Sequence, residues 1–327
     1  MRAAVIEPDG SLSVRGIDDP TPGPRDLVLR VTGCGVCGSD VAARGAMPAG
    51  TVMGHELAGE VVAAGAEVAG TWADGSRAAV LPVFACLNCD ACRTGHVAHC
   101  TNAALVGLGG GHGGFAEYVR VSADLAFPLP DSVPDAHGPL VEPFAVGLHV
   151  ARAAEIVGGD RVLVIGAGAV GLTTATWARQ MGAGSIVVSD PAPARRTTAE
   201  TFEVDATHDP GAGPVEGSFD VVVDCAGKPG LLDVASAAAS THGRIVIAGV
   251  CYEPDTYVPL VPMLKELSLR FAIYYQPGEF QTVVDAFASG AVDPALLLTR
   301  TAPLSELEAL LTRPHPDDLK VVVDPTL

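Results

Sequence analysis

Residues 161–171 read RVLVIGAGAVG, an apolar run that leads directly into three glycines at positions 166, 168 and 171. A short apolar run rich in Val and Ile is typical of a strand buried in a parallel sheet. Glycines at this spacing let a helix begin close to the end of such a strand, where its backbone N–H groups can bind a pyrophosphate. The segment therefore predicts a strand, a tight turn and a helix that together bind a dinucleotide.

The residues that follow continue the alternation of strand and helix. We expect apolar strands at 185–189, 219–224, 243–248 and 267–275, and helical stretches at 170–181, 195–203, 231–239 and 280–288. Such an alternation indicates a parallel sheet with helices on both faces. Residues 145–290 are therefore predicted to form a doubly wound α/β domain.

The flanking segments have a different character. Residues 1–144 are rich in Gly, Pro and short β-branched runs, such as those at 27–31 and 60–62. This pattern predicts a mostly β domain with loops. Residues 291–327 return to the same mixed character and end in KVVV at 320–323. The α/β domain is thus predicted to be inserted into a second domain made of residues 1–144 and 291–327.

An acidic residue follows the second predicted strand of the α/β domain. Asp190 lies nineteen residues after Gly171, where a carboxylate would accept hydrogen bonds from an adenosine ribose and repel a 2′-phosphate. NAD is therefore favoured over NADP, although Arg195 and Arg196 could reach a phosphate if they do not simply form a solvated helix face. The candidate cofactor-binding residues are Gly166, Gly168, Val170, Gly171, Asp190 and Arg195.

Four of the eight cysteines lie close together in a segment without helical or strand periodicity. They are Cys86, Cys89, Cys92 and Cys100. Four thiolates around tetrahedral zinc can hold a loop that has no hydrophobic core of its own. Because such a site has no open position for a substrate, we expect this zinc to be structural.

A second group of metal-binding residue types is more dispersed. Cys37 forms a CxxC pair with Cys34, but no further cysteine pair is available to complete another four-thiolate site. His55 and Glu56 follow eighteen residues after Cys37, and Glu142 comes later. A cysteine, a histidine and a carboxylate make a catalytic zinc site with one open position. These residues leave open which of the two glutamates is the third ligand.

The amino-acid composition disfavours some classes of binding partner. The chain has 38 acidic and 20 basic residues and a formal net charge of −18, which opposes binding to nucleic acid and anionic lipid. The N-terminal residues have no signal-peptide pattern, and glycines interrupt the most apolar window, at 162–177. We therefore expect a cytoplasmic protein that binds neither nucleic acid nor membranes.

Several motifs occur together in one order along the chain. They are CGSD at 37–40, Gly-His-Glu at 54–56, the four-cysteine spacing, GGFAEYV at 113–119, Glu142-Pro143 and the glycines at 166–171. In these motifs the chain resembles the zinc-dependent medium-chain dehydrogenase/reductases, the group of alcohol, polyol and threonine dehydrogenases. The resemblance covers essentially the whole chain and implies a GroES-like catalytic domain and a Rossmann coenzyme domain.

The resemblance also implies residue roles. It implies that Cys37, His55 and Glu142 bind the catalytic zinc, with Glu56 as an alternate or exchanging ligand. Asp40 matches a carboxylate that orients the ligand histidine, and Ser39 matches the hydroxyl that hydrogen-bonds the substrate oxygen and starts a proton relay. Cys34, Cys225 and Cys251 are expected to be structural, and Phe84, His112 and Phe115 are candidates for lining the pocket.

The chain departs from the family pattern in two ways. Ala42 stands where many relatives have a histidine that continues the proton relay, and the stretch between Cys37 and His55 is shorter than usual. The proton would then leave through ribose hydroxyls and water, or through another base. The shorter stretch could open or reshape the pocket.

Together, two zinc ions and NAD predict reversible oxidation of an alcohol, expected to be a secondary alcohol or a polyol, to a ketone or aldehyde. The alternatives are a zinc-independent NADPH enone or quinone reductase and a non-catalytic NAD-sensing protein on the same fold. A zinc hydrolase is disfavoured by the dinucleotide motif. We also expect a homodimer or homotetramer, because an apolar edge strand at 267–275 that remained unpaired would favour aggregation.

Overall fold

The computed structural model describes residues 1–327, which form two units. One unit consists of Met1–Glu142 and Gln276–Leu327, and the other of Pro143–Tyr275. The predicted boundaries lay at 144/145 and 290/291. The second differs because helix α8 (Pro277–Ser289) belongs to the first unit, where the Phe280 ring lies 4.8 Å from that of Phe127.

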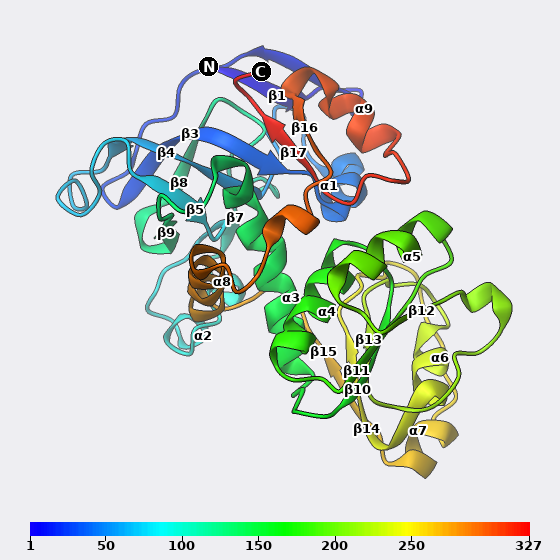
Figure 1. The fold of residues 1–327 in the computed structure, drawn as a ribbon. Coiled ribbons are helices and arrows are strands. Elements are labelled where there is room, and N and C mark those ends of the chain that lie inside the picture. Colours follow the sequence, from blue (N-terminus) through cyan, green and yellow to red (C-terminus); the bar gives the residue numbers. More distant parts are fainter. The chain divides into compact units, whose positions relative to one another are not determined.

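The second unit is built on a six-stranded parallel sheet with the order β12-β11-β10-β13-β14-β15 (Figure 1). Its strands are β10 (Arg161–Ile165), β11 (Ser185–Ser189), β12 (Ala206–His208), β13 (Phe219–Asp224), β14 (Ala239–Ile247) and β15 (Ser268–Phe271). Its helices are α4 (Ala169–Gln180), α5 (Pro193–Ala199), α6 (Leu231–Ala238) and α7 (Leu260–Lys265). The doubly wound fold expected from the glycine motif is confirmed.

Several details of this unit differ from the sequence pattern, and neither β12 nor α7 was predicted. β15 is shorter than the strand predicted at 267–275, and the helix predicted at 195–203 is α5 followed by a 3-10 turn (Glu200–Phe202). Helix α3 (Val141–Ala153), which carries Glu142 in its first turn and continues into this unit, was not predicted.

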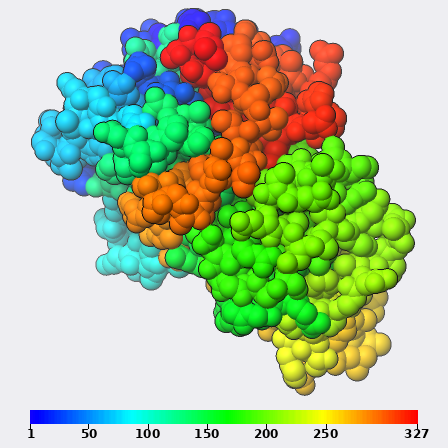
Figure 2. Space-filling model, in the orientation of Figure 1, coloured from blue at the N-terminus to red at the C-terminus, as the bar shows by residue number.

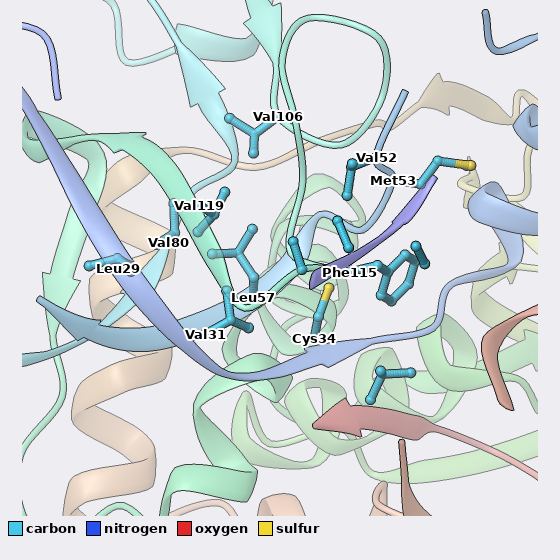
Figure 3. Packing of buried hydrophobic residues seen from close by; sticks show 14 of the residues in the cluster. Leu29, Val31, Cys34, Val52, Met53, Leu57, Val80, Val106, Phe115 and Val119 are labelled. Carbon is cyan, nitrogen blue, oxygen red and sulfur yellow. The ribbon is translucent and has the colours of Figure 1, made fainter. Parts of the chain in front are cut away.

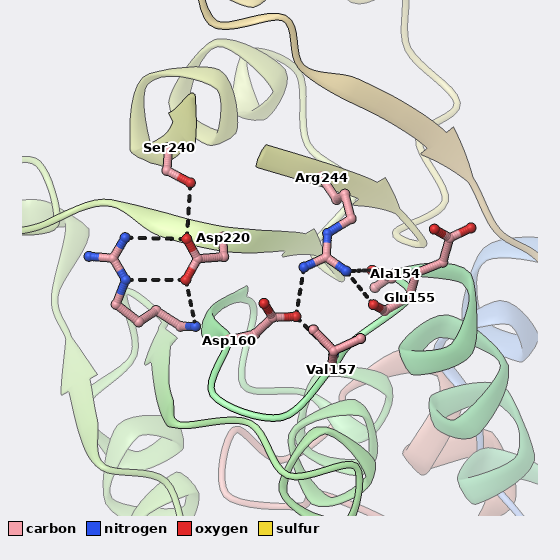
Figure 4. A network of polar contacts seen from close by, with 8 residues as sticks. Ala154, Glu155, Val157, Asp160, Asp220, Ser240 and Arg244 are labelled. Carbon is pink, nitrogen blue, oxygen red and sulfur yellow. Dashed lines mark hydrogen bonds and ion pairs between the residues drawn. The ribbon is translucent and has the colours of Figure 1, made fainter. Parts of the chain in front are cut away.

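Charged residues join the amino ends of the central strands (Figure 4). Asp160, just before β10, accepts hydrogen bonds from the Val157 N–H at 2.9 Å and from Arg244 of β14 at 2.6 Å. Arg161 and Asp220 form an ion pair of 3.2 Å between β10 and β13. The polar side chains thus hold the end of the sheet opposite the glycine motif.

The first unit is mostly antiparallel β structure. Its seven-stranded sheet has the order β16-β17-β3-β4-β5-β9, and β8 also pairs with β3. The strands are β3 (Asp26–Gly35), β4 (Glu56–Ala64), β5 (Arg77–Val80), β8 (Tyr118–Ser122), β9 (Ala126–Pro128), β16 (Arg300–Pro303) and β17 (Val321–Asp324). Two smaller sheets are formed by β1 (Arg2–Ile6) with β2 (Leu12–Gly16), and by β6 (Val83–Phe84) with β7 (Ala104–Leu105). The helices, besides α8, are α1 (Gly38–Ala43), α2 (Asp90–Arg93) and α9 (Leu307–Thr312).

The core of this unit lies against the β3–β4 pair (Figure 3). Leu29 and Val31 of β3 and Leu57 of β4 are fully buried, together with Phe115. Both chain termini also belong to this unit, and the Arg2 guanidinium donates to the Pro325 carbonyl at 2.9 Å (Figure 1). β17 at the C-terminal end therefore completes a sheet that begins near the N-terminus, which is why the α/β unit is an insertion.

None of the helices has the length and apolar character needed to cross a membrane.

Candidate active site and metal centres

Strand pairing brings Cys37 and His55 together. Cys37 follows β3 and caps the N-terminus of α1, while His55 immediately precedes β4. The antiparallel register places Gly35 opposite Glu56, so the ends of the two strands are neighbours. The Cys37 sulfur, a His55 ring nitrogen and a Glu56 carboxylate oxygen all lie within 4.8 Å of one another. Sulfur, imidazole and carboxylate donors in such a cluster are suited to zinc.

The histidine is oriented by residues of α1. His55 Nδ1 lies 3.3 Å from Asp40 Oδ1, and His55 Nε2 lies 3.3 Å from the Ser39 hydroxyl. Asp40 is fully buried, and its Oδ2 accepts a hydrogen bond of 2.9 Å from the Cys37 N–H. An aspartate that faces Nδ1 favours a proton on that nitrogen and leaves Nε2 as the electron-pair donor on the Ser39 side. Burial opposes protonation of His55, but Asp40 and Cys37 raise its pKa well above the ordinary value.

A buried lysine contacts the cluster. Lys320 Nζ donates to Glu56 Oε1 at 2.6 Å and to the Val36 carbonyl at 3.0 Å. Burial opposes the charge of Lys320, but Glu56, Cys37 and Glu142 raise its pKa. Glu56 Oε2 has no hydrogen-bond partner although it is buried. An unpartnered buried carboxylate oxygen beside sulfur and imidazole donors fits a metal ligand.

Sequence reasoning missed Lys320. A lone lysine before an apolar strand is usually solvated, and nothing local marks it as buried. It reaches the cluster because β17 pairs with β3 through Val322 and Gly35.

The structure places Glu142 apart from the tight cluster. It is buried in the first turn of α3 and does not belong to the group whose donor atoms lie within 4.8 Å of one another. Its charge nevertheless acts on Lys320.

The four clustered cysteines converge around one point. They lie between β6 and β7, with Cys92 on α2. The sulfur–sulfur distances are 3.4 Å for Cys86–Cys100, 3.5 Å for Cys89–Cys92 and 4.0 Å for Cys86–Cys92. Zinc–sulfur bonds of about 2.3 Å at tetrahedral angles imply sulfur separations of about 3.8 Å, which fits this set.

The surroundings of Cys89 and Cys100 favour thiolates, whereas burial and the neighbouring Cys89 and Cys100 thiols raise the pKa of Cys92 to about 12. Backbone N–H groups of Cys92 and Thr101 lower the pKa of Cys89 to about 6. The N–H groups of Cys86 and Asn102 donate to the Cys100 sulfur, each at 3.3 Å. All eight cysteines are free thiols, so no disulfide competes with metal binding.

The glycine motif has the close contacts that its spacing predicts. A Cβ on Gly171 would lie 1.9 Å from the Gly166 carbonyl oxygen, so α4 can approach the end of β10 only with glycine there. Asp190, at the end of β11, accepts hydrogen bonds from the Ala167 N–H at 2.9 Å and the Ala192 N–H at 2.8 Å. Gly168 is the N-cap of α4, and Val170 lies in its first turn.

The two arginines of α5 are placed differently. Arg196 donates to the Asp190 carbonyl at 2.7 Å and to Asp209 Oδ2 at 2.9 Å, so its charge is already paired. Arg195 is the neighbouring residue on the same helix.

Other candidates have simpler placements. Cys34 and Phe115 lie in the core of the first unit, so the proposal that Phe115 lines a pocket is wrong (Figure 3). The guanidinium carbon of Arg120 lies 5.2 Å from the centre of the Phe84 ring. His112 and Ala42 are exposed. Cys225 is next to the end of β13, and Cys251 is exposed.

Comparison with known families matches both units. Residues 23–131 match the alcohol dehydrogenase GroES-like domain, and residues 169–289 match the zinc-binding dehydrogenase domain. Sorbitol dehydrogenase of Bacillus subtilis is 28% identical, covering 99% of this chain and 97% of the relative.

Solved structures agree over the whole chain. A zinc-binding dehydrogenase of Sinorhizobium meliloti bound to NADP is 33% identical with a TM-score of 0.92, covering 99% of each chain. An Escherichia coli protein named a short chain alcohol dehydrogenase, in complex with NADH, is 29% identical with the same TM-score and coverage.

Proposed function

This chain belongs to the zinc-dependent medium-chain alcohol and polyol dehydrogenases, and from that premise we propose that it oxidises a secondary alcohol or polyol with NAD, reversibly. The observation that carries the proposal is the cluster of Cys37, His55 and Glu56 in a chain that also has the glycine–Asp190 motif. Sorbitol dehydrogenase among the relatives supports the polyol class.

In the proposed site, Cys37, His55 and Glu142 hold the catalytic zinc, with Glu56 as alternate ligand. Asp40 holds the imidazole so that Nε2 faces the metal side. The Ser39 hydroxyl would hydrogen-bond the substrate hydroxyl and accept its proton while passing its own proton on, through the ribose hydroxyls and water or to another base, because Ala42 offers no relay imidazole. When bound, zinc lowers the pKa of the substrate hydroxyl and NAD accepts the hydride.

Two further assignments concern the structural zinc and the choice of NAD over NADP. A second, structural zinc is assigned to Cys86, Cys89, Cys92 and Cys100. Asp190 accepts hydrogen bonds from the adenosine ribose and disfavours NADP by charge repulsion. Free thiols suit the reducing cytoplasm, which we propose as the compartment.

We also propose a dimer formed at the edge of the parallel sheet. β15 is the last strand in the order, and Phe271 is 73% exposed. Met263 and Leu264 of the neighbouring α7 are similarly exposed, and Figure 2 shows this yellow and gold segment at the surface. An unpaired apolar edge strand favours pairing with a second copy.

The test is NADH formation at 340 nm with primary alcohols, secondary alcohols, polyols and amino alcohols, run in parallel with NADP. We expect turnover with NAD that is lost after chelation and restored by zinc. Cys37→Ala should abolish it. Cys34→Ala, which removes a core thiol three residues away, should retain it.

Other results would decide between the alternatives. Reduction of enones with NADPH after removal of zinc would favour a zinc-independent reductase. Binding of NAD and zinc without turnover of any alcohol or carbonyl would favour an NAD-sensing protein.

A further inference from the structure

Lys320 and Glu56 form an ion pair enclosed by the first unit. The side chains are 3% and 1% exposed, and the Nζ–Oε1 distance is 2.6 Å. Lys320 also donates to the carbonyl of Val36, the residue before Cys37. One ammonium group thus contacts both segments that supply donors to the candidate zinc site.

The two oxygens of Glu56 have different environments. Oε1 is occupied by Lys320, while Oε2 has no hydrogen-bond partner. Oε2 also occupies the space that a side chain on β3 would need, because a Cβ on Gly35 would lie 2.0 Å from it. Glu56 is therefore confined beside the cluster, with one oxygen left for a metal.

The charge around the cluster is strongly negative. Glu56, Cys37 and Glu142 all raise the pKa of Lys320, and the buried Asp40 lies 3.3 Å from His55 Nδ1. A cation in contact with Glu56 offsets part of this charge, and it weakens the attraction between that carboxylate and a divalent metal.

We propose that Lys320 is a positioning residue that restrains Glu56, so that zinc in the resting enzyme keeps an open position for the substrate. This inference rests on the proposed function, because it requires zinc at Cys37 and His55. When Lys320 is removed, Glu56 becomes a permanent ligand and competes with the alcohol.

The test measures metal binding first and activity second. Zinc affinity is measured by competition with a chromophoric chelator, and ligand number by the visible absorption of the Co²⁺-substituted enzyme. For Lys320→Met we expect zinc binding at least about tenfold tighter, weaker Co²⁺ bands typical of a higher ligand number, and a raised KM for the alcohol. Lys320→Arg keeps the charge and should restore all three.

A second variant separates positioning from simple support of the fold. In Glu56→Gln, which is nearly isosteric, zinc affinity should change less than about threefold, because Lys320 already restrains Glu56. Lys320→Met in this background should no longer tighten zinc binding. Unchanged or weaker zinc binding in Lys320→Met, or a large loss of zinc in Glu56→Gln alone, would overturn the proposal.

The control for the premise is zinc stoichiometry. Cys37→Ala should reduce bound zinc from two ions to one per chain. If it does not, the proposed catalytic site is wrong, and the role of Lys320 falls with it. If Cys37→Ala loses one zinc ion but Lys320→Met does not bind zinc more tightly, only the positioning role of Lys320 is wrong.

Discussion

At the scale of single residues, the absence of one atom shapes the candidate site. Gly35 lies opposite Glu56 in the β3–β4 register, and the missing Cβ leaves room for the Glu56 carboxylate beside Cys37 and His55. Any larger residue at position 35 would displace this carboxylate. Asp40 has a comparable effect on His55, because one of its oxygens faces the ring and the other accepts from Cys37.

Cofactor choice is a prediction at this scale. Asp190→Asn removes the charge that would repel a 2′-phosphate but keeps an oxygen that can accept from the glycine turn. We expect the NAD/NADP ratio of kcat/KM to fall by about tenfold. Initial rates with both cofactors measure this ratio. Asp209→Asn removes the charge that pairs with Arg196 but leaves Asp190 in place, so it is the control. An equal change in both variants would contradict the role of Asp190.

Thiol reactivity is a second prediction for individual residues. Burial and the nearby Asp224 raise the pKa of Cys225 to about 12, and burial also raises the pKa of Cys34. A thiol is nucleophilic only as the thiolate, so neither residue should react below these raised pKa values. Iodoacetamide at pH 8 should therefore label the exposed Cys251 in the zinc-loaded protein, as read by peptide mass spectrometry. Labelling of Cys225 at a rate similar to that of Cys251 would contradict the prediction.

At the scale of elements, two segments depend on polar side chains. One is the loop that carries four cysteines, and the other is the C-terminal end of α6, which a lysine caps. The loop between β6 and β7 has only the one-turn helix α2 and a 3-10 turn (Val97–His99), and four sulfurs converge within it. In the other unit, Lys265 of α7 donates to the carbonyls of Ser236, Ala237 and Ala239 at 2.9, 2.7 and 2.7 Å. These carbonyls lie at the end of α6 and have no partner within that helix.

Metal removal tests the cysteine loop. Cys89→Ser should lower bound zinc from two ions to one per chain and make the loop the first site of limited proteolysis, because coordination supplies its folding energy. Atomic absorption and timed proteolysis measure these effects. Cys251→Ser should leave both unchanged, and retention of two zinc ions by Cys89→Ser would contradict the structural site.

Capping by Lys265 predicts a change in stability. Lys265→Met should destabilise the second unit by about 1 kcal/mol, because the carbonyls at the end of α6 lose a charged donor. Denaturant unfolding is followed by fluorescence in a Trp72→Phe background, where Trp177 of this unit is the remaining tryptophan. Lys228→Met, at an exposed position, is the matched control, and equal midpoints for the two variants would show that the cap contributes nothing.

At the scale of the whole molecule, the chain supplies a catalytic unit and a coenzyme unit with separate cores. The first unit closes only when the C-terminal β17 pairs with β3, and the parallel sheet of the second ends at an exposed strand. The exposed apolar residues of α7 and β15 make that edge the proposed contact with a second copy.

The assembly prediction uses a charge at this edge. Phe271→Glu should convert the dimer to monomer, or a tetramer to a smaller species, because a carboxylate would be buried without a partner. Light scattering during size-exclusion chromatography gives the mass. Val14→Glu places the same charge on an exposed residue of the other unit and should have no effect. A wild-type monomer, or an unchanged mass for Phe271→Glu, would contradict this interface.

The sequence by itself determined features that depend on local pattern. The glycine spacing, the alternation of strands and helices and the four-cysteine spacing predicted the two-domain α/β fold and the cysteine cluster. They could do so because hydrophobic periodicity, glycine geometry and metal coordination act over short stretches of chain.

Only the tertiary structure decided which distant residues meet. It placed Lys320 against Glu56 and assigned α8 to the first unit. It also showed that Phe115, predicted to line a pocket, is buried in the core. These outcomes depend on pairing and packing between segments far apart in the chain, as when β17 pairs with β3. Burial of a charge or an aromatic ring at such a contact has no local sequence pattern, because its free energy comes from neighbours that the fold supplies.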